Sequence, residues 1–369
     1  MKIAELDRTL KEFGEIMKIE SVKKSRLAEV DYTNLGFGDY FSDHMVTCEF
    51  SDGVWGEPSI VPFAPIEMSP AALALHYGQT VFEGLKAFRG TGDHKIRLFR
   101  VDRNAARLTA SCTRLCIPAP DESLVIESIK QLVMLDQDWA PSRRGEALYI
   151  RPVLMATEPH LAVRPASQYR LLIFTSPVCE YFARVKSPLY LKAEERYTRA
   201  PLGGTGYAKT ASNYSVTLRP MNDSVEDGFD QILWLDGQEH RYVEEAGQMN
   251  MFFRLGDSVV TPDLSGTILP GVTRESVLTL LSDMDITATE RRLSMDELFQ
   301  AQIEGELYEA FGAGTASVVV PIGRIRHHDD NLCFPDEQPG NLCPKLYDRI
   351  LGIQHGELED HHSWMIPLE

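Results

Sequence analysis

The chain has 369 residues and a formal net charge of −17, with 43% hydrophobic and 25% charged residues. This length accommodates two domains with a core each, and the composition is that of a globular protein. The acidic balance argues against a nucleic-acid partner, because phosphate contacts need a basic face. No stretch approaches the roughly 20 apolar residues of a membrane span, and residues 1–20 lack an apolar run of signal-peptide length. The sequence therefore predicts a soluble, cytoplasmic protein.

In the first half of the chain, hydrophobic patterning predicts strands alternating with a few helices. A strand is predicted over residues 96–100. Asp102 is then predicted to cap a helix that runs to about Leu115, and a second amphipathic helix is predicted over 121–139. Further strands are predicted over 148–155 and 169–175.

A segment rich in turn-forming and charged residues, ending at Pro188, is the predicted domain linker. We predict a smaller N-terminal domain over 1–177, a linker over 178–188 and a larger C-terminal domain over 189–369. Because strands and helices are mixed in both halves, the predicted fold class is α/β and α+β in two domains. After the linker, strands are predicted over 189–193, 232–235, 249–254, 259–261, 308–311 and 317–322, helices over 212–221, 272–284 and 295–303, and a final helix after Gly340.

Two loops in the second half have the character of anion sites. Pro270-Gly271 predicts a turn followed at once by a helix, so the N–H groups of Val272 and Thr273 would face an anion at the helix mouth. Residues 312–317 read Gly-Ala-Gly-Thr-Ala-Ser, a run of small residues that lets the backbone approach a ligand. A plain helix start and a tight turn between strands explain the two loops equally well.

A third loop, rich in glycine, precedes Lys209. Ala208 breaks the pattern of a Walker phosphate loop, so a nucleotide loop is excluded. Glu244 and Glu245 precede Ala246-Gly247, where a carboxylate can meet a pyridinium nitrogen. Two phosphate-compatible loops and a lysine together suit a phosphorylated aldehyde cofactor.

The six cysteines lack metal-type spacing, and no metal site is predicted. They are more typical of a reducing cytosol than of a secreted disulfide scaffold. The six residues are Cys48, Cys112, Cys116, Cys179, Cys333 and Cys343.

From about Phe41 to near the C-terminus, the sequence resembles the branched-chain amino acid aminotransferases of pyridoxal-phosphate fold type IV. The resemblance implies transamination of leucine, isoleucine and valine with 2-oxoglutarate, and pyridoxal 5'-phosphate as cofactor. It rests on many blocks in one order, which are 41–45, 76–88, 97–107, 149–152, 209–214, 245–250, 268–272 and 311–316.

By position in these blocks, Lys209 resembles the catalytic Schiff-base lysine of the family. Glu245 resembles the carboxylate at the pyridine nitrogen, and Tyr214 the tyrosine at the phenolic oxygen. Further cofactor contacts implied by the resemblance are Arg107, Arg199, Val272, Thr273 and Thr315.

The substrate pocket implied by the resemblance has aromatic walls, an arginine and two backbone donors. Arg151 matches the residue that receives the distal carboxylate of glutamate, and the N–H groups of Thr315 and Ala316 match the receptors of the α-carboxylate. Val163 resembles the residue that a second subunit lends to the pocket, so a homodimer is expected. The aromatic residues are Phe41, Tyr77, Phe82, Tyr149 and Tyr181.

The sequence departs from the family at three places. Gln248 stands where a small residue is usual, and Ala211-Ser212 replaces a common Gly-Gly. Ser317 and Val320 occupy the positions of the redox cysteine pair of the animal enzymes.

Two other readings stay open beside this one. The first is another fold type IV enzyme, namely a D-amino acid aminotransferase or an aminodeoxychorismate lyase, which shares the lysine and the glutamate. Tyr77, Tyr149 and Arg151 favour the branched-chain reading over it. The second is a pyridoxal-phosphate-binding protein without turnover.

Overall fold

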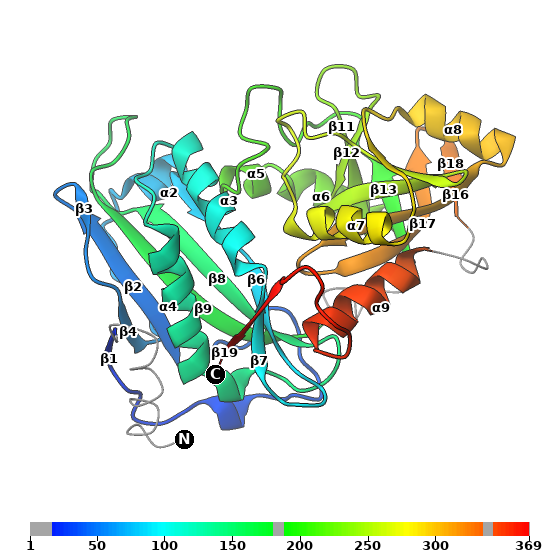
Figure 1. Ribbon diagram of the computed structural model, residues 1–369. Coiled ribbons are helices and arrows are strands. Elements are labelled where there is room, and N and C mark those ends of the chain that lie inside the picture. Colours follow the sequence, from blue (N-terminus) through cyan, green and yellow to red (C-terminus); the bar gives the residue numbers. More distant parts are fainter. Residues whose placement is uncertain (1–16, 180–187, 335–341, 369) are drawn as a thin grey trace. The chain divides into compact units, whose positions relative to one another are not determined.

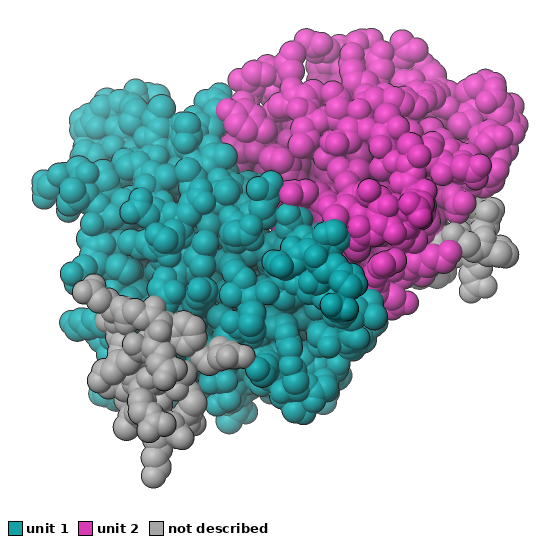
Figure 2. Space-filling model, viewed as in Figure 1, with its two compact units in different colours: residues 1–180, 351–369 teal, residues 181–350 magenta. Residues whose placement is uncertain are grey.

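The computed structural model describes residues 17–179, 188–334 and 342–368, and the chain divides into two compact units. Unit 1 consists of residues Met1–Glu180 and Leu351–Glu369, and unit 2 of Tyr181–Ile350 (Figures 1 and 2). Most of the predicted linker, residues 180–187, lies outside the described residues. The division differs from the predicted one at the C-terminus, because residues 351–369 belong with the N-terminal unit.

Unit 1 is built on a sheet that has ten strands within the described residues, in the order β1-β4-β2-β9-β8-β6-β7-β19, with β3 paired to β2 and β5 to β8. Its centre is antiparallel, as the β8–β9 pairing runs in register from Ala147–Val178 to Ala156–Tyr169. The strands are β1 (Lys18–Ile19), β2 (His44–Ser51), β3 (Val54–Trp55), β4 (Ser59–Pro62), β5 (Thr80–Phe82), β6 (Leu85–Arg89), β7 (Ile96–Phe99), β8 (Ala147–Ala156), β9 (Tyr169–Val178) and β19 (Met365–Leu368).

Two long helices pack on this sheet, α3 (Val101–Arg114) and α4 (Glu122–Leu135) (Figure 1). Their apolar faces join residues of the sheet in one core cluster. The predicted cap at Asp102 is wrong. Helix α3 begins at Val101, the residue before Asp102, and its N-cap is Arg100, at φ 49°. The second helix is shorter than predicted and is followed by a 3-10 turn. The short helices of unit 1 are η1 (Leu27–Glu29), α2 (Leu73–Tyr77) and η2 (Gln137–Trp139).

The end of the chain also differs from the prediction of a final helix. Helix α9 (Leu342–Gln354) is followed by strand β19, which pairs antiparallel with β7 from Met365–Phe99 to Leu368–Ile96. This pairing adds a strand from the last residues of the chain to the sheet of unit 1.

Unit 2 holds a second sheet, with nine strands in the described residues, in the order β12-β11-β10-β17-β16-β13-β14-β15, with β18 paired to β17. Because β12 also pairs with β13, six of these strands form a closed ring. The strands are β10 (Leu189–Ala193), β11 (Gln231–Leu235), β12 (Val243–Ala246), β13 (Met249–Leu255), β14 (Ser258–Thr261), β15 (Ala288–Glu290), β16 (Leu307–Gly314), β17 (Val318–His327) and β18 (Asp330–Cys333).

The helices of unit 2 connect these strands. The helix predicted over 212–221 is in fact two helices, α5 (Ser212–Ser215) and α6 (Leu218–Glu226), which lie between the parallel strands β10 and β11. Helices α7 (Val272–Asp283) and α8 (Met295–Glu304) begin where they were predicted. Within the described ranges, no helix is long and apolar enough to cross a bilayer.

Candidate functional site

A buried ion pair lies at the centre of the candidate site in unit 2. Glu245 on β12 is 4% exposed and Arg199 is 8% exposed. Nη2 of Arg199 lies 2.7 Å from Oε2 of Glu245, and Nη1 of Arg199 donates to the carbonyl of Thr267 at 2.7 Å. Removing a single member of such a pair leaves an uncompensated buried charge, so the arginine favours the ionised form of this buried carboxylate.

The second oxygen of Glu245 is held by strand register and by a loop. Asn250 is paired with Glu245 across the β12–β13 hairpin, and its amide donates to Oε1 at 3.3 Å. The N–H of Leu269 donates to the same oxygen at 3.2 Å. These bonds fix the orientation of the Glu245 carboxylate.

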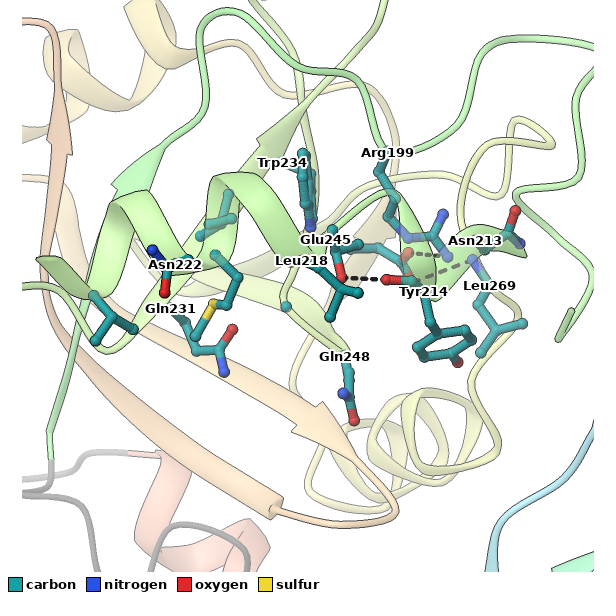
Figure 3. Close-up of a pocket in the computed structure, with 15 residues that line it drawn as sticks. Arg199, Asn213, Tyr214, Leu218, Asn222, Gln231, Trp234, Glu245, Gln248 and Leu269 are labelled. Atoms are coloured by element: carbon teal, nitrogen blue, oxygen red, sulfur yellow. Dashed lines mark hydrogen bonds and ion pairs between the residues drawn. The ribbon is translucent and has the colours of Figure 1, made fainter. Parts of the chain in front are cut away.

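Glu245 faces a cavity of about 370 Å³ (Figure 3). Leu269 lies on one side of the cavity and apolar residues of α6, such as Leu218, on another. The cavity also reaches Trp234 on β11 and Gln248 in the β12–β13 turn. A buried carboxylate facing an apolar cavity is suited to a flat ring that carries a cationic nitrogen.

Lys209 reaches this cavity through Tyr214. Its Nζ donates to the hydroxyl of Tyr214 at 2.9 Å, and Tyr214 lines the cavity together with Glu245. The loop before the lysine is held by Asn213, whose amide donates to the carbonyls of Thr205 and Ala208 at 2.7 and 2.8 Å. The lysine therefore has a fixed backbone and a tyrosine partner.

The predicted phosphate contacts lie at one helix start and one turn. Helix α7 begins at Val272 after Gly271, and the N–H groups of a first turn have no partner inside their own helix. A Cβ at Gly271 would lie 2.1 Å from Oδ1 of Asn250, so any larger residue there would displace the amide that binds Glu245. Thr315 and Ala316 lie in the turn between β16 and β17.

That turn packs on the turn that carries Gln248. A Cβ at Gly314 would lie 3.1 Å from the carbonyl oxygen of Gln248. The two turns are therefore neighbours on the closed ring of strands. An ionised acid for a ring nitrogen, a tyrosine and lysine pair, and helix-start donors for a phosphate together fit the predicted pyridoxal phosphate.

A second buried carboxylate, Glu244, points to a different cavity of about 190 Å³. It is 5% exposed and accepts a hydrogen bond of 2.5 Å from Thr267. Burial raises the pKa of Glu244 to about 7, with the charge of Glu245 adding to the rise and the bond from Thr267 opposing it. The adjacent carboxylates of β12 therefore differ in electrostatic surroundings, because Glu245 has a cation at 2.7 Å and Glu244 is bonded to a hydroxyl.

The predicted substrate residues of unit 1 form a separate cluster. Arg151 on β8 donates to the hydroxyl of Tyr149 at 2.8 Å, and its guanidinium lies 4.7 Å from the ring centroid of Phe82. Its Nε is buried and has no hydrogen-bond partner among the described residues. Gly84 makes room for the tyrosine, because a Cβ there would lie 1.9 Å from its hydroxyl. The structure thus brings two of the predicted aromatic residues together around the cation of Arg151.

The other predicted residues of unit 1 are more scattered. Phe41 stacks on Phe63 and meets the edge of Phe174, the residue that pairs with Arg151 across β8 and β9. Tyr77 donates its hydroxyl to the carbonyl of Leu161. Val163 is 82% exposed. Tyr181 lies outside the described residues.

Arg107 is assigned to the phosphate by resemblance, but it belongs to unit 1, where it has a partner of its own. Its Nε and Nη2 donate to the carboxylate of Glu83 at 2.7 and 2.9 Å, and both residues are buried. Asn104 donates to the same carboxylate at 2.8 Å. The role of Arg107 toward a phosphate stays a prediction.

Several residues of the site were not singled out from the sequence. Asn213, Asn250 and Thr267 each hold a functional group in place, and their role depends on backbone bonds and strand register. The signal for Asn250 is its place opposite Glu245 in a two-residue hairpin. Of the departures, Gln248 lines the cavity, whereas Val320 is buried in the core.

The residues of this site lie in a region that matches a known family. Residues 80–325 match the family described as Amino-transferase class IV. A probable branched-chain-amino-acid aminotransferase of Staphylococcus epidermidis is 46% identical over 95% of this chain and 98% of its own. The branched-chain-amino-acid aminotransferase 2 of Bacillus subtilis is 45% identical over 94% and 95%, respectively.

Solved structures share the fold at lower identity. The branched-chain amino acid aminotransferase from Escherichia coli has a TM-score of 0.71 at 20% identity, covering 89% of this chain and 99% of its own. The T.th. branched-chain amino acid aminotransferase, complexed with N-(5'-phosphopyridoxyl)-L-glutamate, has a TM-score of 0.70 at 24% identity, covering 87% and 98%. These likenesses confirm the predicted two-domain fold of mixed helices and strands.

Proposed function

The chain belongs to the class IV aminotransferase family, and from that premise we propose that it transfers amino groups between branched-chain amino acids and 2-oxoglutarate with pyridoxal phosphate as cofactor. The observation that carries the proposal is the cavity where the buried Glu245–Arg199 pair meets the Tyr214–Lys209 pair. A cytoplasmic location is part of the proposal and rests on the sequence.

Pyridoxal phosphate, when bound, supplies an aldehyde carbon for the amino group and a protonated pyridine ring that withdraws electrons. The residues of this chain do the rest. Glu245, ionised beside Arg199, holds the proton on the ring nitrogen. Lys209 moves a proton at the substrate Cα, with Tyr214 orienting its amine. The start of α7 and the turn at Thr315 receive the phosphate.

We assign recognition of glutamate to Arg151. The guanidinium is held by the rings of Phe82 and Tyr149 and by the hydroxyl of Tyr149, and its Nε has no hydrogen-bond partner within the described residues. A carboxylate is the natural partner of such a fork, and a charge-assisted pair with the half-buried Arg151 would favour glutamate over a substrate that lacks a distal carboxylate. The rings of Phe82 and Tyr149 offer apolar contact to a branched side chain at the same place.

The proposal is tested with purified protein, L-leucine and 2-oxoglutarate. Formation of glutamate, dependent on pyridoxal phosphate, is expected. D-alanine or aminodeoxychorismate turned over in preference to L-leucine would assign the chain to one of the other fold type IV activities. A yellow protein without turnover of any of these substrates would show that it binds the cofactor without catalysis.

We further propose that the protein is a homodimer, with the loop around Val163 at the interface. Exposed apolar side chains gather there, since Leu75, Leu161 and Val163 are 62%, 67% and 82% exposed and the hydroxyl of Tyr77 bonds to the carbonyl of Leu161. Burying such side chains against a second copy removes apolar area from water.

Sedimentation velocity tests the dimer. Wild type is expected to sediment as a dimer, and Val163→Asp to shift toward monomer with loss of activity. Val54→Asp makes the same change at another exposed valine, which lies on β3 outside the Val163 loop and is 65% exposed, and it serves as the control. A fully active monomer would contradict the proposal.

A further inference from the structure

Two adjacent histidines come together at the end of strand β17. His327 is the last residue of β17, and His328 opens the turn to β18. Side chains of neighbouring strand residues normally point to opposite faces. Here His328 has the left-handed φ of 53°, and the two ring centroids lie only 4.1 Å apart. The turn conformation at His328 therefore places the two imidazole rings side by side, although adjacent strand residues would point apart.

A carboxylate from another strand completes the cluster. Glu195 follows β10, which runs parallel to β17. Its Oε1 accepts the backbone N–H of His328 at 2.7 Å, and its Oε2 lies 2.8 Å from Nδ1 of the same residue. The backbone bond fixes the carboxylate independently of the state of the rings.

The charge state of the three groups suits a cation. Burial lowers the pKa of His327, and the charge of His328 lowers it further. Burial raises the pKa of Glu195, but the hydrogen bonds from His328 outweigh it and hold that pKa below its ordinary value. Burial thus favours the neutral ring of His327, and the bonds from His328 favour the carboxylate form of Glu195, which are the forms that bind metals. Asp296 and Asp330 add negative charge nearby.

We propose that Glu195, His327 and His328 form a binding site for a late first-row divalent metal ion, of which Zn²⁺ is the probe. One donor atom of each residue lies within 4.8 Å of the other two. Two imidazoles and one carboxylate are a donor set that Zn²⁺ prefers, whereas Mg²⁺ and Ca²⁺ prefer oxygen alone. Nε2 of His327 is buried without a partner among the described residues, so an imidazole nitrogen is left unused.

This site is separate from the cofactor cluster but is connected to it along the chain. The segment after Glu195 runs directly to Arg199, the partner of Glu245. A metal ion held by the three residues would tie the end of β10 to the β17–β18 turn and so restrain the start of that segment.

Isothermal titration of metal-free holoenzyme with Zn²⁺ tests the site. We expect saturable binding of one ion per chain that Mg²⁺ does not reproduce. His328→Asn removes a donor and should weaken Zn²⁺ binding by at least about tenfold. Losing only a hydrogen-bond partner of a metal ligand already costs about that much affinity. His361→Asn is the matched control, because His361 also lies near a carboxylate, that of Glu359 at 3.7 Å, and is exposed.

Glu195→Gln is a second test, because it keeps an acceptor for the backbone N–H of His328 and removes the charge. It should also lose at least about tenfold in affinity for Zn²⁺. Zn²⁺ should raise the thermal unfolding temperature of wild type and of His361→Asn, and not of the two site variants. Absence of saturable binding, or equal affinity in His328→Asn and His361→Asn, would overturn the proposal.

Discussion

The polar cluster around Glu245 in unit 2 and the one around Arg151 in unit 1 differ in how their charges are satisfied. In unit 2, Glu245 has a permanent cationic partner in Arg199 at 2.7 Å. In unit 1, Arg151 is held by a phenol and by aromatic rings, and no carboxylate within the described residues forms an ion pair with it. A carboxylate with its own counter-ion keeps the same charge state throughout, whereas a cation without a counter-ion can bind the carboxylate of a substrate. The former suits a resident cofactor, and the latter an exchanging substrate.

The largest effect is expected when the reacting amine of Lys209 is removed. Lys209→Ala should lower transamination by at least about 10³-fold, because no other group then moves the proton at Cα. The loss is measured as glutamate formed from leucine and 2-oxoglutarate, with circular dichroism to verify folding. Lys192→Ala changes a lysine of β10 that pairs with Asp227 at 2.5 Å, and it should be nearly neutral. More than trace turnover by Lys209→Ala would remove the central assignment.

The fixed charge of unit 2 is tested next. Glu245→Gln should bind pyridoxal phosphate, seen by its visible absorbance, and react about 10²-fold or more slowly. A neutral amide still accepts a bond from Arg199 but does not hold a proton on the ring nitrogen. A normal rate in this variant, with the loss appearing in Glu244→Gln, would move the role to the neighbouring carboxylate.

The exchangeable charge of unit 1 should show a selective effect. Arg151→Met should cost the half-reaction with glutamate about 2–3 kcal/mol, the scale of a lost charged hydrogen bond. The leucine half-reaction should lose about 1 kcal/mol or less, from imperfect repacking. Single-turnover kinetics with each amino acid measure both. Arg170→Met on β9, next to Glu49, is the control. Equal losses for both substrates would make Arg151 a structural support of the pocket.

The last prediction concerns stability rather than catalysis and rests on Glu244, whose pKa is about 7 in the folded protein against an ordinary 4.5. The folded state therefore binds the proton more tightly than the unfolded state, and stability falls as pH rises from about 4.5 to about 7. The full penalty, present above pH 7, is at most about 3 kcal/mol. Glu244→Gln removes this ionisation.

Denaturant unfolding of wild type and Glu244→Gln at pH 5.5 and pH 8 measures the difference. Relative to wild type, the variant should gain about 2 kcal/mol more at pH 8 than at pH 5.5. The same difference at both pH values would mean that another group takes up the proton.

The sequence predicted those parts that depend on local pattern or on resemblance. The helix after Gly271 and the two-domain fold of mixed helices and strands are of this kind. Strand β12 was missed because Glu244 and Glu245 occupy its middle, and carboxylates are depleted in strands. The bond from Asn250 to Glu245 depends on hairpin register, which the sequence of β12 did not reveal.

The last strand was missed for a different reason. Residues 365–368 are few and include Pro367, which lacks an N–H for a ladder. Their strand exists because β7, at residues 96–99, supplies an edge from far away in the sequence. A local pattern cannot foresee a pairing whose energy comes from a partner more than 250 residues earlier, as the numbers of β7 and β19 show.

The pairing of β19 with β7 has a consequence for synthesis on the ribosome. Domains commonly fold in the order in which they emerge. Here the unit that contains residues 17–179 lacks an edge strand until residues 365–368 leave the exit tunnel, whereas all of unit 2 is already made. Until then β7 presents unpaired N–H and C=O groups, a state in which strand edges recruit foreign partners. A nascent chain that stalls before residue 365 would thus expose an aggregation-prone edge in its oldest part.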